Sequence, residues 1–171
     1  LEYMVFRPHN VYGEYQNLGD RYRNVVGIFM NQVMQNKPLT VFGDGEQTRA
    51  FSYVGDVIPA IARCVEVEAS KNETFNVGGD DVFSVNTLAD TVLRVLGSKV
   101  DKRHLPARNE VMHAYSDHTK LHAVFGAPEV TPLAQGIEKM WAWARERGVT
   151  KTKRFEAIEL TEGLPAIWLE D

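Results

Sequence analysis

The sequence has little that would suit a disulfide-bonded, membrane-spanning or nucleic-acid-binding protein. Cys64 is the only cysteine among 171 residues, so an internal disulfide is excluded and a reducing compartment, the cytoplasm, is expected. No apolar run approaches the roughly 20 residues that a membrane helix needs, and no basic-then-apolar signal segment opens the chain. The formal net charge of −4 disfavours attraction to nucleic acid or to an anionic membrane. Any anion site must therefore be built locally, from a few arginines.

Two patterns that would point to a cofactor or to a metal are missing as well. Gly43-Asp44-Gly45 is followed three residues later by Thr48, not by the glycine that completes a dinucleotide fingerprint, and it reads as a turn. His118 and His122 are spaced to share a helix face, but no glutamate of the metalloprotease pattern lies between them and no third ligand is evident. Two exposed polar residues are therefore the favoured interpretation, and we expect no metal site.

The residues that are present are typical of a single globular domain. A chain of 171 residues with 44% hydrophobic and 25% charged residues can bury one good core. Strands are expected at residues 3–7, 39–42 and 75–77, with a strand-like stretch at 110–115. The alternation of short strands with helical segments predicts the α/β class.

Helices are expected where apolar residues recur at helical spacing after a capping residue. Asn24 precedes the first such run, in which Val25, Ile28, Phe29 and Val33 are predicted to face inward. Asp56 is the predicted cap of the second, with Ile58, Ile61, Ala62 and Val65 inward. Three further helices are predicted from Ser84 to Gly97, from Asp117 to Gly126, and from Thr131-Pro132 to Gly148.

The chain has too few predicted strands to form an independent doubly wound sheet. Its predicted elements suit a small mixed domain that leans on a larger one. The chain starts at Leu1, directly before a core-like strand, which predicts a piece of a longer protein. A short natural protein is the alternative, and the sequence does not choose between them.

Several motifs, in order and spacing, resemble one family. Residues 7–13 read Arg-Pro-x-Asn-x-Tyr-Gly, and residues 39–57 read Leu-Thr-Val-Phe-Gly-Asp-Gly-x-Gln-x-Arg-x-Phe-x-Tyr-Val-x-Asp-Val. Residues 75–79 and 84–89 continue the match, and residues 155–160 resemble the ending of one branch. The chain is thus similar to the C-terminal half of extended short-chain dehydrogenases/reductases, the NAD-dependent epimerases and dehydratases that act on nucleotide sugars.

The resemblance implies a domain organisation. Residues 1–171 would form a single substrate-binding domain of a Rossmann-type enzyme, without most of its NAD-binding sheet. Residues 1–13 would be the last strand and loop of the missing dinucleotide-binding domain, and residues 149–171 a surface tail.

The resemblance also implies a site for a nucleotide sugar such as a UDP-sugar. Thr40 and Phe42 alternate along one strand and would take the base, although periodicity alone favours Phe42 as a core residue. Arg49 and Arg108 would bind the pyrophosphate, because a guanidinium offers forked charged donors. Arg49 lies in a segment that reads as buried, whereas Arg108 otherwise reads as a solvated surface residue.

Four more residues would complete this site by the resemblance. Glu110 would accept the ribose hydroxyls, although the Arg108-Asn109-Glu110 spacing is one residue shorter than the common family pattern. Asn10 would hydrogen-bond the diphosphate-sugar, with a loop-stabilising Asx-turn as the alternative. Asn24 and Val25 would contact the substrate at a helix start, where backbone amides favour anions.

The family's chemistry needs NAD and a Tyr-x-x-x-Lys pair. Pro8 and His9 stand where family members contact the nicotinamide end of NAD, but no tyrosine here is followed by lysine four residues later. We therefore expect an inactive chain that binds no NAD alone, from a parent enzyme of the UDP-hexose 4-epimerase type. The alternative is a stand-alone domain that binds nucleotide sugars or another polypeptide. Either way, oligomerisation or association with the missing half is expected.

Overall fold

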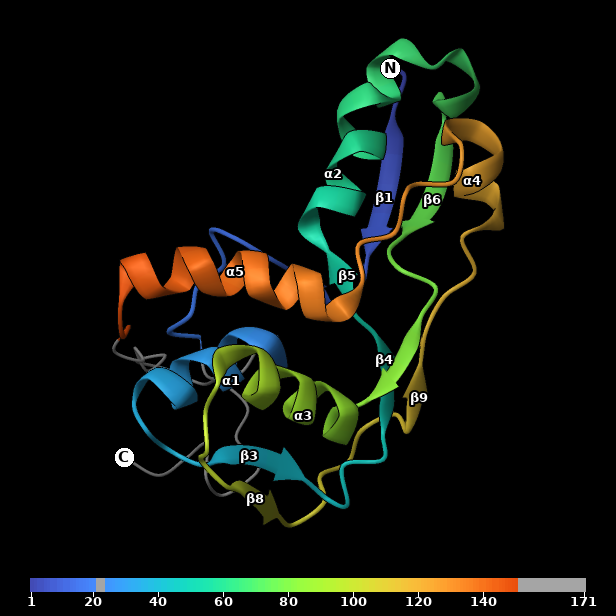
Figure 1. The fold of residues 1–171 in the computed structure, drawn as a ribbon. Coiled ribbons are helices and arrows are strands. Elements are labelled where there is room, and N and C mark those ends of the chain that lie inside the picture. The colour runs from blue at the N-terminus through green and yellow to red at the C-terminus, as the bar shows by residue number, and fades with distance from the viewer. Residues whose placement is uncertain (21–23, 151–171) are drawn as a thin grey trace.

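A computed structural model describes residues 1–20 and 24–150. Within them the chain is a mixed α/β structure with small sheets, as expected from the sequence (Figure 1). All but the first two residues of the tail expected at 149–171, including the 155–160 motif, lie outside the described residues.

Short elements alternate along the chain. The strands are β1 (Met4–Pro8), β2 (Val11–Tyr12), β3 (Leu39–Phe42), β4 (Thr48–Ala50), β5 (Ser52–Tyr53), β6 (Glu73–Val77), β7 (Val82–Ser84), β8 (Lys102–Leu105) and β9 (His113–Ala114). The helices are α1 (Val25–Met34), α2 (Val54–Arg63), α3 (Val85–Leu96), α4 (Thr119–Phe125) and α5 (Leu133–Arg147), with the 3-10 turns η1 (Cys64–Glu66) and η2 (Glu68–Ser70).

The strands pair in four small sheets. β1 pairs with β6, β2 with β5 and β3 with β8, each in parallel. β4 lies between β7, which runs antiparallel to it, and β9, which runs parallel. The expected strand at residues 110–115 is thus only the two residues of β9, because a single short neighbour, β4, is there to pair with it.

The molecule has two lobes (Figure 1). The upper lobe consists of β1, β6, α2 and α4, and its core is built from Val57, Phe75, Val77 and Leu121. The lower lobe consists of α1, α3, α5, β3 and β8, and it holds the larger core. The sheet of β7, β4 and β9 runs beside both lobes (Figure 1).

Helix α1 forms where it was expected, with Asn24 as its N-cap, whose side chain accepts a hydrogen bond from the Val26 amide. The predicted inward face is partly wrong. Val26, Phe29 and Met30 are buried, whereas Val25 and Ile28 are only half-buried. The reason is that α1 has two apolar faces, and the second of them borders the cleft described below.

Helix α2 differs from its prediction in both start and orientation. It begins at Val54, so Asp56 lies in its first turn, and its carboxylate instead accepts hydrogen bonds from the Thr131 amide and hydroxyl ahead of α5. Ile58 and Val65, predicted to face inward, are 50% and 75% exposed, and Ala62 is exposed as well. Only the two-stranded β1–β6 sheet lies in this lobe, so it can bury only one side of the helix.

Among the remaining predicted N-caps only Ser84 is confirmed, because α4 has His118 and α5 has Pro132 at the N-cap, neither with a side-chain hydrogen bond. Gly97, Gly126 and Gly148 are C-caps, as predicted. The Ser84 hydroxyl caps α3 by accepting from the Thr87 amide, and Gly97 ends the helix in the left-handed conformation. The Asp117 carboxylate accepts from the amide of Thr119, the first residue of α4, although Asp117 lies two residues before the helix begins. Among the described residues, no helix has the length and apolar character needed to cross a membrane.

Candidate functional site

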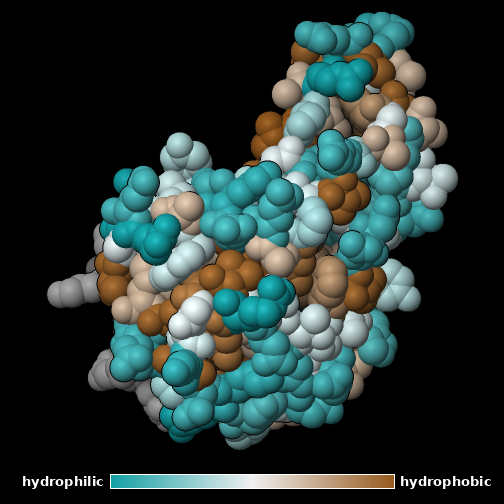
Figure 2. Space-filling view, in the orientation of Figure 1, coloured by the Kyte–Doolittle hydropathy of each residue, from teal (hydrophilic) through white to brown (hydrophobic). Residues whose placement is uncertain are grey.

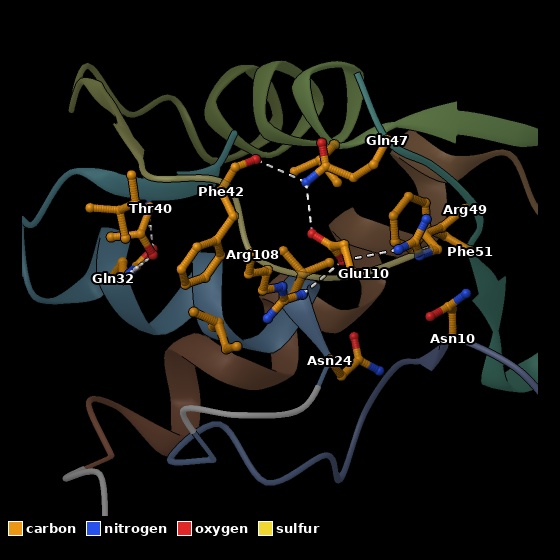
Figure 3. A pocket seen from close by; sticks show the side chains of 14 residues that line it. Asn10, Asn24, Gln32, Thr40, Phe42, Gln47, Arg49, Phe51, Arg108 and Glu110 are labelled. Atoms are coloured by element: carbon orange, nitrogen blue, oxygen red, sulfur yellow. Dashed lines mark hydrogen bonds and ion pairs between the residues drawn. The ribbon is translucent and has the colours of Figure 1, made fainter. Parts of the chain in front are cut away.

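A cleft of about 250 Å³ opens in the lower lobe, close to the lower end of the roughly 300–1,000 Å³ usual for ligand pockets. Helix α1, strands β3 and β4, and the chain that follows β8 supply its walls (Figure 3). Its lining residues are Asn10, Asn24, Val25, Ile28, Gln32, Thr40, Phe42, Gln47, Arg49, Phe51, Val85, Leu105, Arg108 and Glu110.

All eight residues that the sequence suggested for a nucleotide sugar line this one cleft. They are Asn10, Asn24, Val25, Thr40, Phe42, Arg49, Arg108 and Glu110. Pro8 and His9, suggested for NAD, are not among the lining residues. The structure therefore brings the first group together, while the role of each member stays a prediction.

Strand alternation explains how two sides of the cleft are built. Thr40 and Phe42 are two apart on β3, and Gln47, Arg49 and Phe51 are two apart through β4, so each set shares one face. The turn between these strands needs Gly45, which has a φ of 80°. A Cβ at Gly45 would lie 2.4 Å from the Asn86 side-chain oxygen, so a side chain there would push the turn off α3.

Phe42 is a cleft residue and not a core residue, contrary to its periodicity alone. It is half-buried, and the Arg108 guanidinium lies 4.7 Å from its ring centroid. A cation over an aromatic face is attracted by the ring quadrupole. This contact brings a charged group and a flat apolar surface to the same place.

Glu110 joins the two arginines. Its Oε2 accepts from Arg49 Nη2 and from Arg108 Nη2, each at 3.0 Å, and its Oε1 accepts from Gln47 Nε2 at 3.3 Å (Figure 3). The Arg49 and Glu110 side chains are only 15% and 20% exposed. Two guanidinium groups against one carboxylate leave the lining of the cleft with a net charge of +1 in a chain of net −4.

Arg49 is held by the backbone on its other side. Its Nη1 donates to the Thr48 carbonyl at 2.7 Å and to the Met112 carbonyl at 3.1 Å. With the bond to Glu110, contacts among the described residues use three of the five guanidinium donors and leave two. The guanidinium is therefore fixed in place before any anion arrives, which lowers the entropy lost on binding.

The two asparagines lie toward the other side of the cleft (Figure 3). Asn10 has a φ of 43° and Asn24 a φ of 60°, a left-handed region that asparagine tolerates better than most residues. Asn24 Nδ2 donates to the Val11 carbonyl while its oxygen caps α1, so this side chain ties strand β2 to the start of the helix. The structural role expected of Asn24 is present, and it is compatible with binding.

Sequence reasoning missed several residues of the cleft. Gln32 follows Ile28 by four and Val25 by seven residues, which places all three on one face of α1. Gln47 and Phe51 alternate with Arg49. The helical spacing of Gln32 and the alternation of Gln47 and Phe51 are both visible in the sequence. They predict cleft residues only if Val25 and Arg49 are already known to face a ligand.

His9 lies in a histidine cluster away from the cleft lining. Its ring stacks on that of His118, with centroids 5.0 Å apart and planes 4° apart. The expectation that His118 is exposed is wrong, because it is 2% exposed and its Nδ1 lies 2.6 Å from Asp80 Oδ1. Burial, and then the neighbouring His118, lower the pKa of His9 below its ordinary value.

The cluster does not resemble a metal site. Both nitrogens of His9 and the Nε2 of His118 are buried and have no hydrogen-bond partner among the described residues. Because the rings are parallel and stacked, their in-plane lone pairs cannot converge on one ion. Within residues 1–20 and 24–150, no group of three histidine, cysteine, aspartate or glutamate side chains is placed to hold a metal. Cys64 is buried and free.

Comparison with known proteins gives consistent results. Residues 1–78 match the NAD dependent epimerase/dehydratase family. A Methanocaldococcus jannaschii protein named "Putative UDP-glucose 4-epimerase" is 34% identical over 151 residues, which are 88% of this chain and 48% of that protein.

Solved structures agree with the sequence comparison. UDP-glucose 4-epimerase from Thermotoga maritima, solved with UDP-glucose, has a TM-score of 0.77 at 31% identity over 86% of this chain and 47% of that one. UDP-glucuronic acid 4-epimerase from Bacillus cereus, solved with UDP-glucuronic acid and NAD, has a TM-score of 0.75 at 25% identity over 84% and 45%. The chain thus spans about half the length of these relatives.

Proposed function

This chain belongs to the NAD-dependent epimerase/dehydratase family of extended short-chain dehydrogenases/reductases, and on that premise we propose that its cleft binds a nucleotide sugar. The base would lie at Thr40 and Phe42, and the pyrophosphate between Arg49 and Arg108. Glu110 would turn to the ribose hydroxyls, and Asn10, with the Asn24–Val25 helix start, would face the sugar side.

One observation carries this proposal: two arginines converge on a cleft that also holds an aromatic face. The guanidinium groups supply the positive charge that a pyrophosphate needs, and they meet on the single carboxylate of Glu110. Phe42, under Arg108, supplies a flat surface for a base. A nucleoside diphosphate has both an anionic group and a flat base, whereas a free phosphate has only the charge and a simple sugar has neither.

We propose UDP-hexose 4-epimerisation as the leading activity of the whole enzyme, with dehydration, decarboxylation or reduction as the other reactions open to it. NAD would supply the hydride chemistry, and Pro8 and His9 would face its nicotinamide end. This chain has no Tyr-x-x-x-Lys and no glycine fingerprint, so by itself it would be inactive and would not hold NAD. The buried lone Cys64 fits a cytoplasmic location.

The edge of β1 supports association with another polypeptide segment or a second copy. Within the described residues β1 pairs only with β6, and Tyr3, directly before β1, and Val5 on it are 53% and 41% exposed. A strand with one unpaired edge and apolar side chains is a template for a further strand. The missing dinucleotide-binding half is the partner that we propose first, and a homo-oligomer second.

A second candidate function is a stand-alone, non-catalytic domain that binds nucleotide sugars. The specific support for it is that this chain alone brings two arginines, a carboxylate and an aromatic ring to one cleft. In this case the cleft would work without a second half.

Calorimetric titration of the chain with UDP and then with NAD tests these proposals. We expect UDP to bind and NAD not to bind. Arg63→Ala, an exposed change on α2 outside the cleft, is the control for general damage. Binding of NAD alone, or of neither ligand, would contradict the nucleotide-sugar proposal for this cleft.

A further inference from the structure

Glu110 occupies the positive groups of the cleft with a negative charge that belongs to the chain itself. Its Oε2 lies 3.0 Å from Arg49 Nη2 and 3.0 Å from Arg108 Nη2, so one carboxylate oxygen bridges the two guanidinium groups (Figure 3). None of the three side chains is more than 32% exposed, and water and salt screen such partly buried charges less than surface charges. A phosphate oxygen of a ligand would need the same donors.

The chain segment that carries Glu110 is a loop, residues 106–112, which joins β8 to β9 without helix or strand. Backbone hydrogen bonds fix the loop at both ends, at Leu105 directly before it and at Met112. Between these ends Arg108 and Glu110 line the cleft, while the residues on either side of Glu110 are exposed. The ion pairs of Glu110 therefore hold the middle of the loop against the cleft.

Gln47 holds the other oxygen of the same carboxylate. Its Nε2 donates to Glu110 Oε1 at 3.3 Å and to the Phe42 carbonyl at 3.0 Å. Both of these partners can only accept, so the amide nitrogen must face them, and these bonds use both of its N–H groups. Gln47, itself buried, thus stabilises the arrangement in which Glu110 is paired with the arginines.

A ligand phosphate and the Glu110 carboxylate compete for this site. With Glu110 in place, the lining of the cleft offers one net positive charge, and with Glu110 turned away its two arginines offer two. A phosphate that uses the remaining donors of Arg49 lies beside the carboxylate, and like charges at such short range repel each other. Full use of the arginine pair by an anion therefore requires release of Glu110.

We propose that Glu110 is an internal competitor that keeps small anions out of the arginine pair. It is released by a ligand that takes over both arginine contacts and also gives the freed carboxylate new hydrogen-bond donors. This inference rests on the proposed function, in which a pyrophosphate meets the arginines and ribose hydroxyls meet Glu110. Inorganic pyrophosphate satisfies the first condition and not the second, so its binding leaves a carboxylate without partners, which is costly.

The test measures the binding of UDP and of inorganic pyrophosphate by calorimetry in metal-free buffer. Four forms of the chain are compared: unchanged, Glu110→Gln, Gln47→Met and Glu46→Gln. Glu110→Gln keeps the shape of the side chain and removes its charge, so pyrophosphate should bind about tenfold or more tightly. UDP should gain less, because an amide oxygen is a weaker acceptor for hydroxyls than a carboxylate. The ratio of UDP affinity to pyrophosphate affinity should therefore fall.

Gln47→Met separates release of Glu110 from simple repulsion, since it changes no charge. It deletes a bond that stabilises the paired state and that breaks when the carboxylate turns away. If Glu110 is released on binding, pyrophosphate affinity should rise about fivefold, as expected for about one net hydrogen bond. The lost bond to the Phe42 carbonyl affects the empty and the occupied cleft alike, so it cancels.

Glu46→Gln is the matched control for charge. Glu46 is exposed, lies outside the cleft lining and accepts a hydrogen bond from Asn86 Nδ2 at 2.7 Å, which a glutamine oxygen can still accept. The change removes the same charge as Glu110→Gln, close to the cleft in sequence and without touching the arginines. Both affinities should stay near those of the unchanged chain.

The outcomes distinguish this inference from the proposed function. Pyrophosphate affinity that stays unchanged in Gln47→Met overturns the release of Glu110, and an equal gain in Glu110→Gln and Glu46→Gln overturns its competition for the arginines. In either case, UDP binding to the unchanged chain leaves the proposed function standing. Tighter pyrophosphate binding in Glu110→Gln and Gln47→Met, with no form binding UDP, upholds the competition and overturns the nucleotide-sugar proposal. Binding of neither ligand to any form overturns both.

Discussion

The two lobes of this molecule differ in how completely each buries its own hydrophobic side chains. The lower lobe packs α1, α3 and α5 on one another and on β3, and several of its core side chains, such as Phe29, Leu88 and Ile137, have no exposed surface. The described part of the upper lobe has a core cluster of four buried residues around a two-stranded sheet. The lower lobe therefore resembles a complete domain core, and the upper lobe resembles one side of a larger layer.

Exposed hydrophobic residues occur in both lobes. Tyr3, Val5, Ile58 and Val65 of the upper lobe and its adjoining turn are 53%, 41%, 50% and 75% exposed, and Tyr15 and Val149 near α5 are 88% and 52% exposed. Hydrophobic residues reach the surface of both lobes in Figure 2. The cleft takes its lining from α1, β3 and the chain after β8 in the lower lobe and from β4 in the adjoining sheet. The contrast between the lobes therefore lies in their cores, and the cleft borders the lobe with the larger one.

The largest expected effect comes from deleting one aromatic core side chain in each lobe. Phe29→Ala and Phe75→Ala both remove a fully buried ring, and each change should cost about 3–5 kcal/mol where it acts. Hydrogen exchange resolved by peptide should show Phe29→Ala loosening both α1 and α3. Phe75→Ala should loosen β1 and β6 and leave α1 protected. If both variants loosen both lobes equally, the lobes unfold as one unit and the contrast fails.

Arg49→Ala should give the next largest effect, and only on binding. It removes one of the two guanidinium groups of the proposed phosphate site, so UDP affinity should fall by about 1.5–3 kcal/mol, as expected for losing a charged hydrogen-bond partner. The matched variant Arg63→Ala lies on the upper lobe, is exposed, and should bind UDP as before. Unchanged affinity in Arg49→Ala would remove Arg49 from the site.

Thr131→Val sharpens the comparison at the junction of the lobes. The Thr131 hydroxyl donates to Asp56 Oδ1 at 2.7 Å, which ties α2 of the upper lobe to the start of α5. Losing this bond should lower the free energy of unfolding by about 1 kcal/mol. Thr91→Val, which deletes a hydroxyl bonded within α3 at 2.8 Å, is the control. Equal thermal shifts in the two variants would show that the junction has no special role.

Acid should give the smallest effect near neutral pH, and it should be confined to the upper lobe. The pKa of His9 is lowered from its ordinary 6.5 by burial and then by His118, while Asp80 opposes the shift. The native state therefore binds fewer protons than the unfolded state around this pKa. Stability is complete above about pH 6.5 and falls as the pH drops toward the folded-state pKa.

Hydrogen exchange of β1 and β6 at pH 7.5 and pH 5 measures this effect. We expect faster exchange in acid for the unchanged chain and a weaker pH dependence for His9→Phe, which keeps a ring against His118. His104→Gln, an exposed change on β8, is the control and should keep the acid effect. An undiminished acid response in His9→Phe would assign it to another group.

Local signals predicted the helices well and the small strands poorly. Asn24, Ser84 and Gly97 lie at helix ends for reasons that a few neighbouring residues decide, so their roles could be inferred from sequence. β2 and β5 are two residues each and exist only because they pair with one another across 40 positions of chain, which no local pattern reveals. The outward side of α2 was mispredicted for the same reason, because it depends on how much sheet faces the helix.

The candidate site also has a part that the sequence predicted and a part that it did not. The resemblance and the alternation of Thr40 with Phe42 gave residues that the structure brings to one cleft. Glu110 binds both Arg49, 61 residues before it, and Arg108, two residues before it. The long-range bond to Arg49 depends on the fold and could not be predicted from a local pattern. Gln32 was missed because its partner, Thr40, lies on a different element.

Helix α1 contributes Val26 and Phe29 to the core and Val25, Ile28 and Gln32 to the cleft. Occupancy of the cleft is therefore coupled by mass action to the integrity of the fold. A ligand at one hundred times its dissociation constant adds about 2.7 kcal/mol to the free energy of unfolding if it binds only the native state. The melting temperature of the lower lobe thus serves as a label-free report on what the cleft accepts, and nucleotide libraries can be ranked without any assay of turnover.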